Sequence, residues 1–480
     1  MDDIKNIKEK QGDENVKRKW LSKHSFKILL FILLLLVINI TSVIAQEGEE
    51  ESEKLLPPEK LQEDLNFIIS TLRDVHPALN EGPLLNAFNE RAKAALAHIN
   101  HPMTRFDFYL LAGDLVNSLK DAHTLLWIKS NRRLPLMFRW VNDGIVIVGK
   151  PGLPIQKGDQ LIRLGGLAPE ELLEKLRILI PAENDFWIKR MGERYLISDF
   201  FLKSFKLLTP DETVKLTLKH ANGEIYTIEL PLKTTQAKLN YKPKRHWFGW
   251  KLNTEYGYGL FWLDKCENTP EYKKAVDEFF TAVKESGIKR IAIDVRYNSG
   301  GNSRVINAFL KYLPAKTIHE FRSEIRFSPQ AIEKRGYSKL FPLFRAIYKL
   351  LWNNKSNTPR PSDPNLIFNG KVFVLTSWQT FSSGNWIAVL LKDNKLATIV
   401  GEPTGNAPSS FGDILIFETP NLQLKFSVSH KYFARPNPKA DFANTLKPDV
   451  FIPTTINDIR KGRDPQLEWL VNFATEKDNQ

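Results

Sequence analysis

The sequence predicts an α/β protein in which a helical segment and a strand-rich segment precede an α/β core. Residues 57–127 place apolar side chains at helical spacing, and residues 132–233 form short strand-like runs bounded by glycine. From residue 256 onward, apolar strand-like runs alternate with amphipathic runs. Alternation of this kind predicts a mostly parallel sheet covered by helices.

The helical segment, residues 46–130, starts with an acidic stretch and continues into PPEKLQEDLNFIISTLRDVHP. Apolar residues at Leu61, Leu65, Ile68 and Leu72 have helical spacing, and the pattern ends before a proline. A second stretch, RFDFYLLAGDLVNSLKDAHTLLW, continues the helical pattern and then becomes strand-like. We therefore expect a small helical part that ends in a strand.

The strand-rich segment, residues 131–235, contains the runs DGIVIVG and GDQLIRLGG. It ends in VKLTLKHANGEIYTIELPL, which predicts a hairpin whose turn is ANGE. The core, residues 236–480, alternates YGYGLFWL, EYKKAVDEFFTAVKESG, IKRIAIDV, GKVFVLTS and NWIAVLLKDN. The chain of 480 residues is long enough for two or three domains with a sizeable core.

The N-terminus, residues 1–45, has the layout of an export signal. A basic approach precedes an apolar run that starts at Ile28, and small residues at Val43 and Ala45 precede Gln46, which predicts a secretory signal cleaved after Ala45. An uncleaved signal anchor is the alternative, because the apolar run approaches the bilayer thickness. The Lys and Arg excess before it favours a cytoplasmic N-terminus, so we expect an extracytoplasmic protein, secreted or anchored.

Composition excludes several classes of function. The net charge of +13 is dispersed and accompanies no recognition motif, so we expect no nucleic-acid partner and interpret the charge as attraction to anionic lipid or cell wall. The single cysteine, Cys266, excludes an internal disulfide framework, a Cys-based zinc site and an iron–sulfur cluster.

Two polar loops follow buried strand-like runs of the core. In a parallel sheet, sites form at the carboxyl ends of the strands, so the loops 294–301 and 376–384 are expected to face one cavity. Paired glycines at Gly300 and Gly301 allow backbone N–H groups to approach an oxyanion, although a plain tight turn has the same signature. In the second loop, TFSSGNW, a serine could be a nucleophile or the N-cap of the next helix.

A histidine is the expected base for such a serine. His123, in LKDAHTLLW, stands where a helical pattern gives way to a strand and has Asp121 and Thr124 beside it. His76, before a proline, has the position of a helix-end residue. His123 is therefore the candidate base.

Four stretches, in this order, resemble the S41 peptidases, the C-terminal or tail-specific processing proteases, and among them the tricorn-like serine–histidine branch. They are LKDAHT, IDVRYNSGGN, VLTSWQTFSSGNWIAVLLKD and ATIVGEPTG, and the resemblance extends from Pro57 to Trp469. It implies a crotonase-like (ClpP/crotonase-type) α/β core. It also implies that residues 131–235 are a PDZ-like module, which binds peptides by strand addition or serves as a lid or spacer.

The resemblance also assigns roles to residues. It places the nucleophile at Ser382, the base at His123, the oxyanion donors at the backbone N–H groups of Gly300 and Ser383, and a third, acidic residue at Asp441. The implied activity is hydrolysis of peptide bonds in a peptide or protein substrate through an acyl-enzyme. Such a mechanism uses no metal and no cofactor.

Other interpretations stay open at this point. A serine–lysine mechanism is excluded, because Ala407 stands where that branch of the family has its lysine. A catalytically inactive, peptide-binding relative at the cell surface is the main alternative; a crotonase-like acyl-CoA enzyme conflicts with the export signal. The amphipathic segment 333–357 could cap the site or contact a membrane surface. The sequence does not indicate an oligomeric state.

Overall fold

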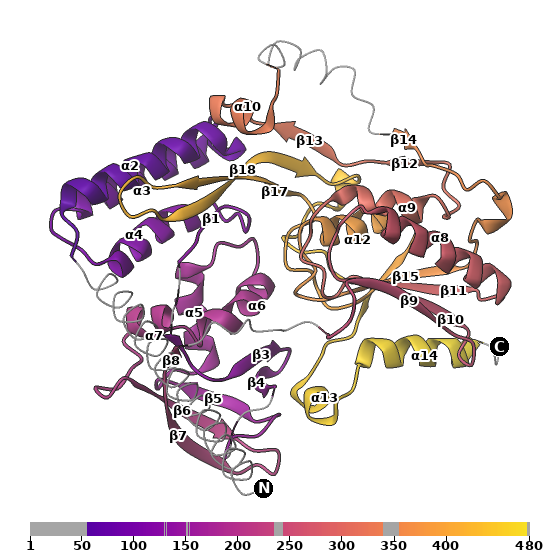
Figure 1. Cartoon of the computed structure of the whole chain (residues 1–480), viewed down its shortest axis with the longest axis horizontal. Coiled ribbons are helices and arrows are strands. Elements are labelled where there is room, and N and C mark those ends of the chain that lie inside the picture. Colours follow the sequence, from indigo (N-terminus) through magenta and orange to yellow (C-terminus); the bar gives the residue numbers. More distant parts are fainter. Residues whose placement is uncertain are drawn as a thin grey trace, which may run out of the picture. The chain divides into compact units, whose positions relative to one another are not determined.

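The computed structural model describes residues 55–128, 132–149, 154–234, 243–338 and 355–477, together with the single residues 130 and 152. The predicted signal segment and most of the amphipathic segment 333–357 lie outside these residues. Residues 56–480 form one compact unit, which holds all the helices and strands of the described residues (Figure 1). Within the described ranges, no helix is both long and apolar enough to cross a membrane.

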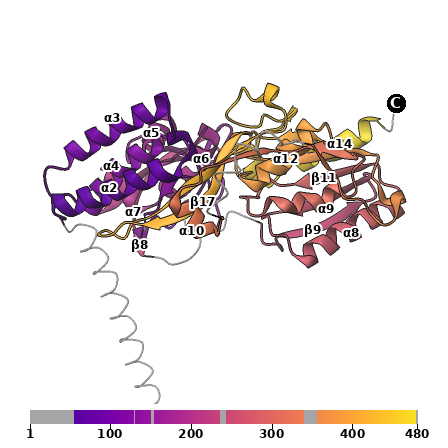
Figure 2. The same cartoon turned by 90° about the horizontal axis from the view of Figure 1, so that it is seen from above.

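The helical segment forms as predicted. Its elements are α2 (Pro58–Val75), the 3-10 turn η1 (Pro77–Leu79), α3 (Pro83–His98) and α4 (Arg105–Asn117). Helix α2 buries the side chains whose spacing predicted it, and Figure 2 shows α2, α3 and α4 lying together. Thr104 caps α4 by accepting a hydrogen bond from the Asp107 backbone N–H at 3.1 Å.

The strand-rich segment contains a five-stranded sheet in the order β3-β4-β5-β6-β7, with every pairing antiparallel. Its strands are β3 (Met137–Val141), β4 (Gly144–Val148), β5 (Gln160–Leu164), β6 (Thr213–Lys219) and β7 (Ile225–Pro231). The predicted hairpin is confirmed as β6 and β7, joined through the ANGE turn. Residues 169–204 differ from the expected short strands and form the helices α5 (Pro169–Leu179), α6 (Asp185–Tyr195) and α7 (Asp199–Ser204).

The predicted mostly parallel sheet is confirmed in the core. Its order is β19-β16-β15-β11-β10-β9, and only the edge strand β9 runs antiparallel. The strands are β9 (Phe248–Asn253), β10 (Tyr258–Leu263), β11 (Arg290–Asp294), β15 (Lys371–Thr376), β16 (Thr398–Gly401) and β19 (Val450–Phe451).

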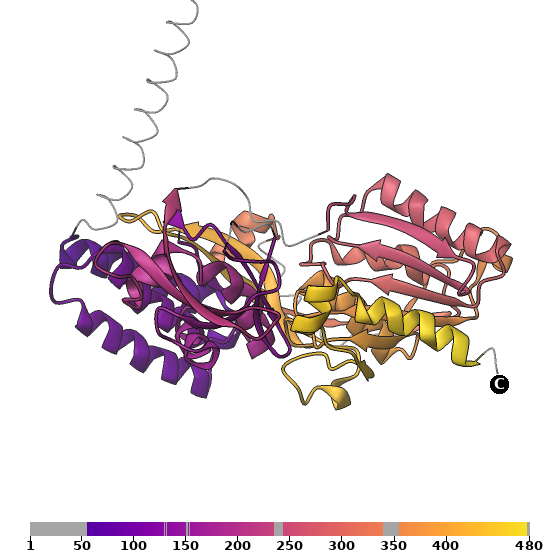
Figure 3. The same cartoon turned by 90° about the horizontal axis from the view of Figure 1, so that it is seen from below.

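Helices cover both faces of this sheet. Phe261, Ile293 and Val374 point to the face covered by α8 (Pro270–Glu285), α9 (Ile306–Leu310) and α12 (Ser383–Asp393). The neighbouring residues on the same strands pack instead against α14 (Pro465–Lys477), which crosses the opposite face in Figure 3. The alternation of side chains along each strand thus explains why these strands read as continuous apolar runs.

A second sheet joins the helical segment to the core. Strand β1 (Leu125–Leu126) pairs antiparallel with β18 (Lys425–Ala434), which also pairs with β13 (Arg322–Ile325) and β17 (Ser410–Glu418). Because β1 begins two residues after His123, this pairing holds the His123 segment against the C-terminal part of the chain. The remaining elements are short: β2 (Arg132–Arg133), β8 (Lys233–Thr234), η2 (Ser303–Val305), β12 (Thr317–His319), α10 (Pro329–Arg335), β14 (Lys355–Asn357), η3 (Pro364–Leu366), η4 (Pro438–Ala440) and α13 (Ile456–Lys461).

Candidate active site

Ser382 lies at the turn between β15 and α12. It occupies the N-cap position of α12, yet its side chain makes no capping hydrogen bond. Its backbone is strained, with φ 52° and ψ −126°, a region that non-glycine residues rarely occupy. The Asn406 Oδ1 atom holds this backbone in place by accepting a hydrogen bond from the Ser382 N–H at 2.9 Å. The hydroxyl is therefore presented outward instead of being used as a helix cap.

The neighbouring serine has a different role. The Ser383 hydroxyl donates a hydrogen bond to the Gly301 carbonyl at 2.7 Å, so it ties α12 to the loop after β11. Its backbone N–H is the first amide of α12 and donates no hydrogen bond to any of the described residues. That amide is thus available for an anion above the helix N-terminus.

The two polar loops meet, as predicted, through close backbone approaches. A Cβ atom on Gly300 would lie 2.6 Å from the Ser382 Cβ and 3.2 Å from the Ser383 nitrogen. Gly300 has φ +106°, so only glycine fits here on both counts. The Gly300 N–H was expected to be free for an oxyanion. Instead it donates a hydrogen bond to the Oδ1 of Asn298, two residues earlier in the loop, at 2.8 Å.

His123 lies on the same cavity as Ser382. The cavity has a volume of about 610 Å³, and Gly301, Ser383 and the Arg335–Asp413–Lys431 ion group also line it. The His123 ring stacks on Phe381, the residue before Ser382, with 4.5 Å between the ring centroids. Both ring nitrogens are buried and have no hydrogen-bond partner among the described residues, so no hydrogen bond joins His123 to Ser382 in this conformation.

Asp121 holds the backbone around His123. Its Oδ1 accepts a hydrogen bond from the His123 backbone N–H at 2.9 Å, and its Oδ2 accepts from Thr124 Oγ1 at 2.6 Å and from His76 Nε2 at 3.2 Å. Burial disfavours the charged carboxylate, but the nearby His123 ring and the hydrogen bond from His76 favour it and hold the pKa of Asp121 well below its usual value. Asp121 is therefore ionised, and His76, predicted as a helix-end residue, also buttresses it.

Glu183 is a second carboxylate beside His123, and sequence reasoning missed it. It lies in the loop before α6, and both of its carboxylate oxygens are buried without a hydrogen-bond partner among the described residues. Burial, and then the negative charge of Asp121, raise the pKa of Glu183 to about 8. No local pattern marks this residue, because the groups that surround it come from distant parts of the chain.

Asp441, the acid that the resemblance assigned, does not join this group. It is exposed at the end of the turn η4 and is not one of the residues that line the cavity. The loop near it does reach Glu183, because the Asn444 side chain donates a hydrogen bond to the Glu183 carbonyl at 2.7 Å. The structure thus brings Ser382, His123, Gly300 and Ser383 to one place, with Glu183 as the additional acid.

The side chains around His123 include groups of the kind that bind metal ions. Among the described residues, one group of His, Asp and Glu side chains has its donor atoms within 4.8 Å of one another, namely Asp121, His123 and Glu183. The Asp121 oxygens already accept three hydrogen bonds, which favours a hydrogen-bonding cluster around the imidazole. We therefore do not identify these residues as metal ligands.

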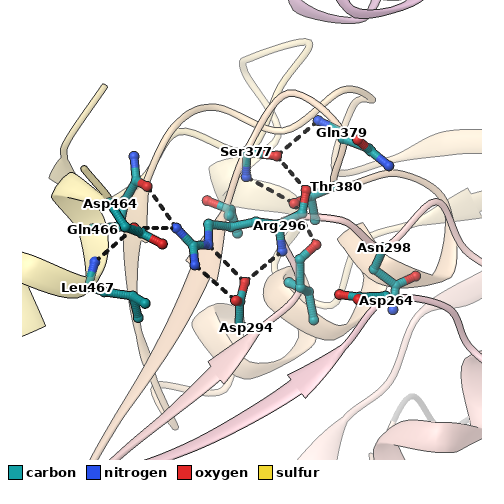
Figure 4. A network of polar contacts seen from close by, with 12 residues as sticks. Asp264, Asp294, Arg296, Asn298, Ser377, Gln379, Thr380, Asp464, Gln466 and Leu467 are labelled. Atoms are coloured by element: carbon teal, nitrogen blue, oxygen red, sulfur yellow. Dashed lines mark hydrogen bonds and ion pairs between the residues drawn. The ribbon is translucent and has the colours of Figure 1, made fainter. Parts of the chain in front are cut away.

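A buried polar network supports both polar loops from below (Figure 4). Asp294, at the end of β11, accepts hydrogen bonds from the Arg296 guanidinium at 2.9 Å through each oxygen. The same guanidinium donates to Asp464 at 2.6 Å, at the start of α14. The Ser377 hydroxyl donates to the Arg296 carbonyl at 2.5 Å, and the Thr380 hydroxyl to the Val295 carbonyl at 3.0 Å, so the network fastens the serine loop to the glycine loop.

Comparisons with known proteins agree with the predicted resemblance. The profile of Peptidase family S41 matches residues 260–450, so this segment belongs to that family and the chain has the core of a serine-type peptidase. The match includes Gly300, Ser382 and Ser383 but leaves His123 outside. In a search of curated proteins, no sequence matches the chain.

Among solved structures, the fold is similar to that of CPAF. A crystal structure of mature CPAF aligns with a TM-score of 0.64 at 15% identity, covering 87% of this chain and 96% of that chain. The structure of mature CPAF complexed with lactacystin aligns with a TM-score of 0.63 at 15% identity, covering 87% and 98%. The chain thus has the mixed α/β fold of these proteins along most of its length.

The Asp294–Arg296 pair is predicted to be a main source of stability for the loops. Asp294→Ala leaves the buried Arg296 charge without its main partner, and breaking a buried pair costs about 3–5 kcal/mol. Asp464→Ala is the matched control, because Asp464 is partly exposed and its loss costs about 1 kcal/mol or less. Urea denaturation followed by tryptophan fluorescence measures both; equal losses would contradict the assignment.

Glu183→Gln is predicted to change the pH dependence of stability. The pKa of the Glu183 carboxyl is about 8 in the folded protein and has its ordinary value of 4.5 in the unfolded chain. Because the folded state binds the proton more tightly, the free energy of unfolding falls as the pH rises from 4.5 to about 8. Glutamine removes this titration. The stability difference between variant and wild type should therefore grow across this window, by up to about 1.4 kcal/mol per pH unit. A pH-independent difference in urea denaturation would contradict the burial of an ionisable Glu183.

Proposed function

We propose that this protein hydrolyses peptide bonds through an acyl-enzyme, with Ser382 as the nucleophile and His123 as the general base. The observation that carries the proposal is the convergence of the two side chains on one cavity from distant parts of the sequence. Ser382 stands on strained backbone at a strand-to-helix turn, a geometry that exposes a nucleophile. Catalytic hydrogen bonds are often long or unmade before substrate binds, so the unpartnered His123 ring is compatible with this role.

The proposed reaction uses the groups already described. The Ser382 Oγ attacks the peptide carbonyl carbon while the His123 Nε2 takes the hydroxyl proton, which gives a tetrahedral oxyanion. His123 then delivers this proton to the leaving amine, and the acyl-enzyme forms. A water molecule repeats the sequence: it gives its proton to His123, its oxygen attacks the acyl carbon, and Ser382 recovers its proton.

The oxyanion would be stabilised by backbone donors at the start of α12. The Ser383 N–H is the principal donor, because it has no acceptor among the described residues and lies beside Gly300. The Gly300 N–H joins it only when the Asn298 side chain releases it or shares it. The resemblance assigned both amides to the oxyanion, and the hydrogen bond from Gly300 to Asn298 favours Ser383 as the first donor.

We further propose that the core is crotonase-like and that the β3–β7 sheet with helix α5 is a PDZ-like peptide-binding module. The similarity of the fold to CPAF and the parallel strands on either side of the serine loop support the core assignment. A cavity of about 510 Å³ lies along β5 and the start of α5 and has the size of a site for a short peptide segment. Strand addition would use one of the edge strands, β3 or β7, because β5 is paired on both sides. An extracytoplasmic location rests on the predicted signal at residues 1–45.

Labelling with a fluorophosphonate probe tests the nucleophile and the base. We expect labelling of the purified protein, none for Ser382→Ala, and at least about a hundredfold slower labelling for His123→Ala, because an unassisted hydroxyl is a poor nucleophile. Ser286→Ala, at the end of α8 and outside the cavity lining, is the matched control and should label normally. Tandem mass spectrometry should locate the adduct on Ser382. A folded wild-type protein that fails to label would favour the inactive, peptide-binding alternative.

The same assay tests the absence of a metal from the mechanism. Labelling should proceed at an unchanged rate after dialysis against EDTA, because the proposed nucleophile is activated by an imidazole and not by a Lewis acid. A rate that falls with EDTA and returns with added Zn²⁺ would contradict the proposed mechanism.

A further inference from the structure

We propose that Glu183 is the carboxylate that positions the His123 imidazole and stabilises its protonated form. This inference rests on the proposed serine–histidine function and assigns the acidic role to a residue that precedes α6. The resemblance had placed this role at Asp441, which is exposed.

The loop that carries Glu183 is held firmly against the C-terminal part of the chain. The Asn184 side chain donates hydrogen bonds to the Gly405 carbonyl at 3.2 Å and the Asn444 carbonyl at 2.8 Å. In return, the Asn444 side chain donates to the Glu183 carbonyl at 2.7 Å. Three hydrogen bonds to two distant segments therefore fix the backbone on which the carboxylate sits. Such rigidity is what a positioning residue requires.

Within the described ranges, neither carboxylate oxygen of Glu183 has a hydrogen-bond partner. Burying a polar group without a hydrogen bond costs free energy, and native proteins rarely leave one in this state without a functional reason. Both Glu183 oxygens and both His123 ring nitrogens are in this condition among the described residues. One ring nitrogen of His123 and one carboxylate oxygen of Glu183 lie within 4.8 Å of each other. A small movement of the two side chains toward each other would therefore form one hydrogen bond and give a buried polar atom of each residue its partner.

The hydrogen-bond donor to the Glu183 carboxylate is the His123 ring and not Asp121. The other acid of the cluster, Asp121, is ionised and so has no proton to donate. Asp121 lies 3.7 Å from the His123 Nδ1, which is beyond hydrogen-bond distance, and its oxygens already hold Thr124 and His76. The two acids thus have different roles. Asp121 holds the backbone at His123, and Glu183 accepts the hydrogen bond from the His123 Nδ1–H.

The pH dependence of this arrangement follows from its charges. The charged groups that face Glu183 are Asp121 and His123, with His76 behind Asp121; the segments around Gly405 and Asn444 add no titratable side chain to these contacts. Burial and the Asp121 charge make Glu183 keep its proton up to about pH 8. In that protonated state its neutral carbonyl oxygen is a weaker acceptor for the Nδ1–H and supplies no negative charge to stabilise an imidazolium. Once the proton leaves to solvent, the carboxylate accepts the Nδ1–H and leaves Nε2 unprotonated toward Ser382. Activity should therefore rise as the pH passes about 8.

The kinetic test compares Glu183→Gln with Asp441→Asn, since both change an acid to its amide. With a peptide substrate at pH 8.5, we expect Glu183→Gln to lower kcat by about a hundredfold or more while KM changes little, because the lost interaction forms with the imidazolium of the transition state. Asp441→Asn should keep kcat within about twofold, as expected for an exposed side chain. The rise in kcat/KM near pH 8 should be present in the wild type and absent from Glu183→Gln.

Two results would overturn the inference. One is a loss in Asp441→Asn with normal kinetics in Glu183→Gln. The other is a loss in Glu183→Gln by the same factor at every pH, which a purely structural role would produce. Partial recovery in Glu183→Asp would support the positioning role, because that variant restores a carboxylate on a shorter side chain.

A second readout is independent of turnover and separates this inference from the proposed function. In Ser382→Ala protein labelled with ¹⁵N-histidine, the His123 ring resonances should move when Glu183→Gln is added and stay in place when Asp441→Asn is added. Unchanged His123 resonances would contradict the positioning role even in an active enzyme. A clear shift would support it even if the wild type failed to react with the fluorophosphonate probe.

Discussion

The pairing of β1 with β18 is the interaction on which the candidate site depends. Leu125 and Leu126 pair with Ser427 and Phe426, and the Ser427 hydroxyl donates to the His123 carbonyl at 2.7 Å. This short ladder brings the end of the helical segment to the core, although the two are far apart in sequence. Together with the stacking of the His123 ring on Phe381, it sets the position of His123 relative to Ser382.

The serine side of the site uses backbone strain held by buried polar contacts. Ser382 adopts its unusual conformation because Asn406 holds its N–H and because Gly300 leaves room beside it. Beneath the two loops, the Asp294–Arg296 network connects β11, the serine loop and α14. A strained residue persists only when its surroundings over-determine it, and this network supplies that constraint.

Local patterns were sufficient to predict much of the fold. The parallel sheet follows from apolar runs that alternate with amphipathic helices, and the hairpin of β6 and β7 follows from its ANGE turn. The loop positions of Ser382 and Gly300 follow from their places after buried strands. The structure brings these loops together on one cavity with His123. In each case the signal lies within a short stretch of sequence.

The remaining features depend on contacts between distant segments. The helices α5, α6 and α7 were missed because strand-like runs on either side dominated the pattern of the module. Asp441 is the acid that a loose motif match assigns, but the match does not determine where its side chain lies. Glu183 could not be predicted from the sequence, because only the fold places its buried carboxylate beside His123. The hydrogen bond from the Gly300 N–H to Asn298 likewise depends on the conformation of the loop, which the spacing of residues does not determine.

The central claim is that Ser382 and His123 form one catalytic unit when the site is occupied. A crystal structure of the protein after reaction with a phosphonate inhibitor tests this claim most directly. The account predicts an adduct on Ser382, a His123 Nε2 within about 3.2 Å of an adduct oxygen and the Ser383 N–H donating to the phosphonyl oxygen. An adduct on another residue, or an imidazole that stays beyond hydrogen-bond distance of the adduct, would contradict it.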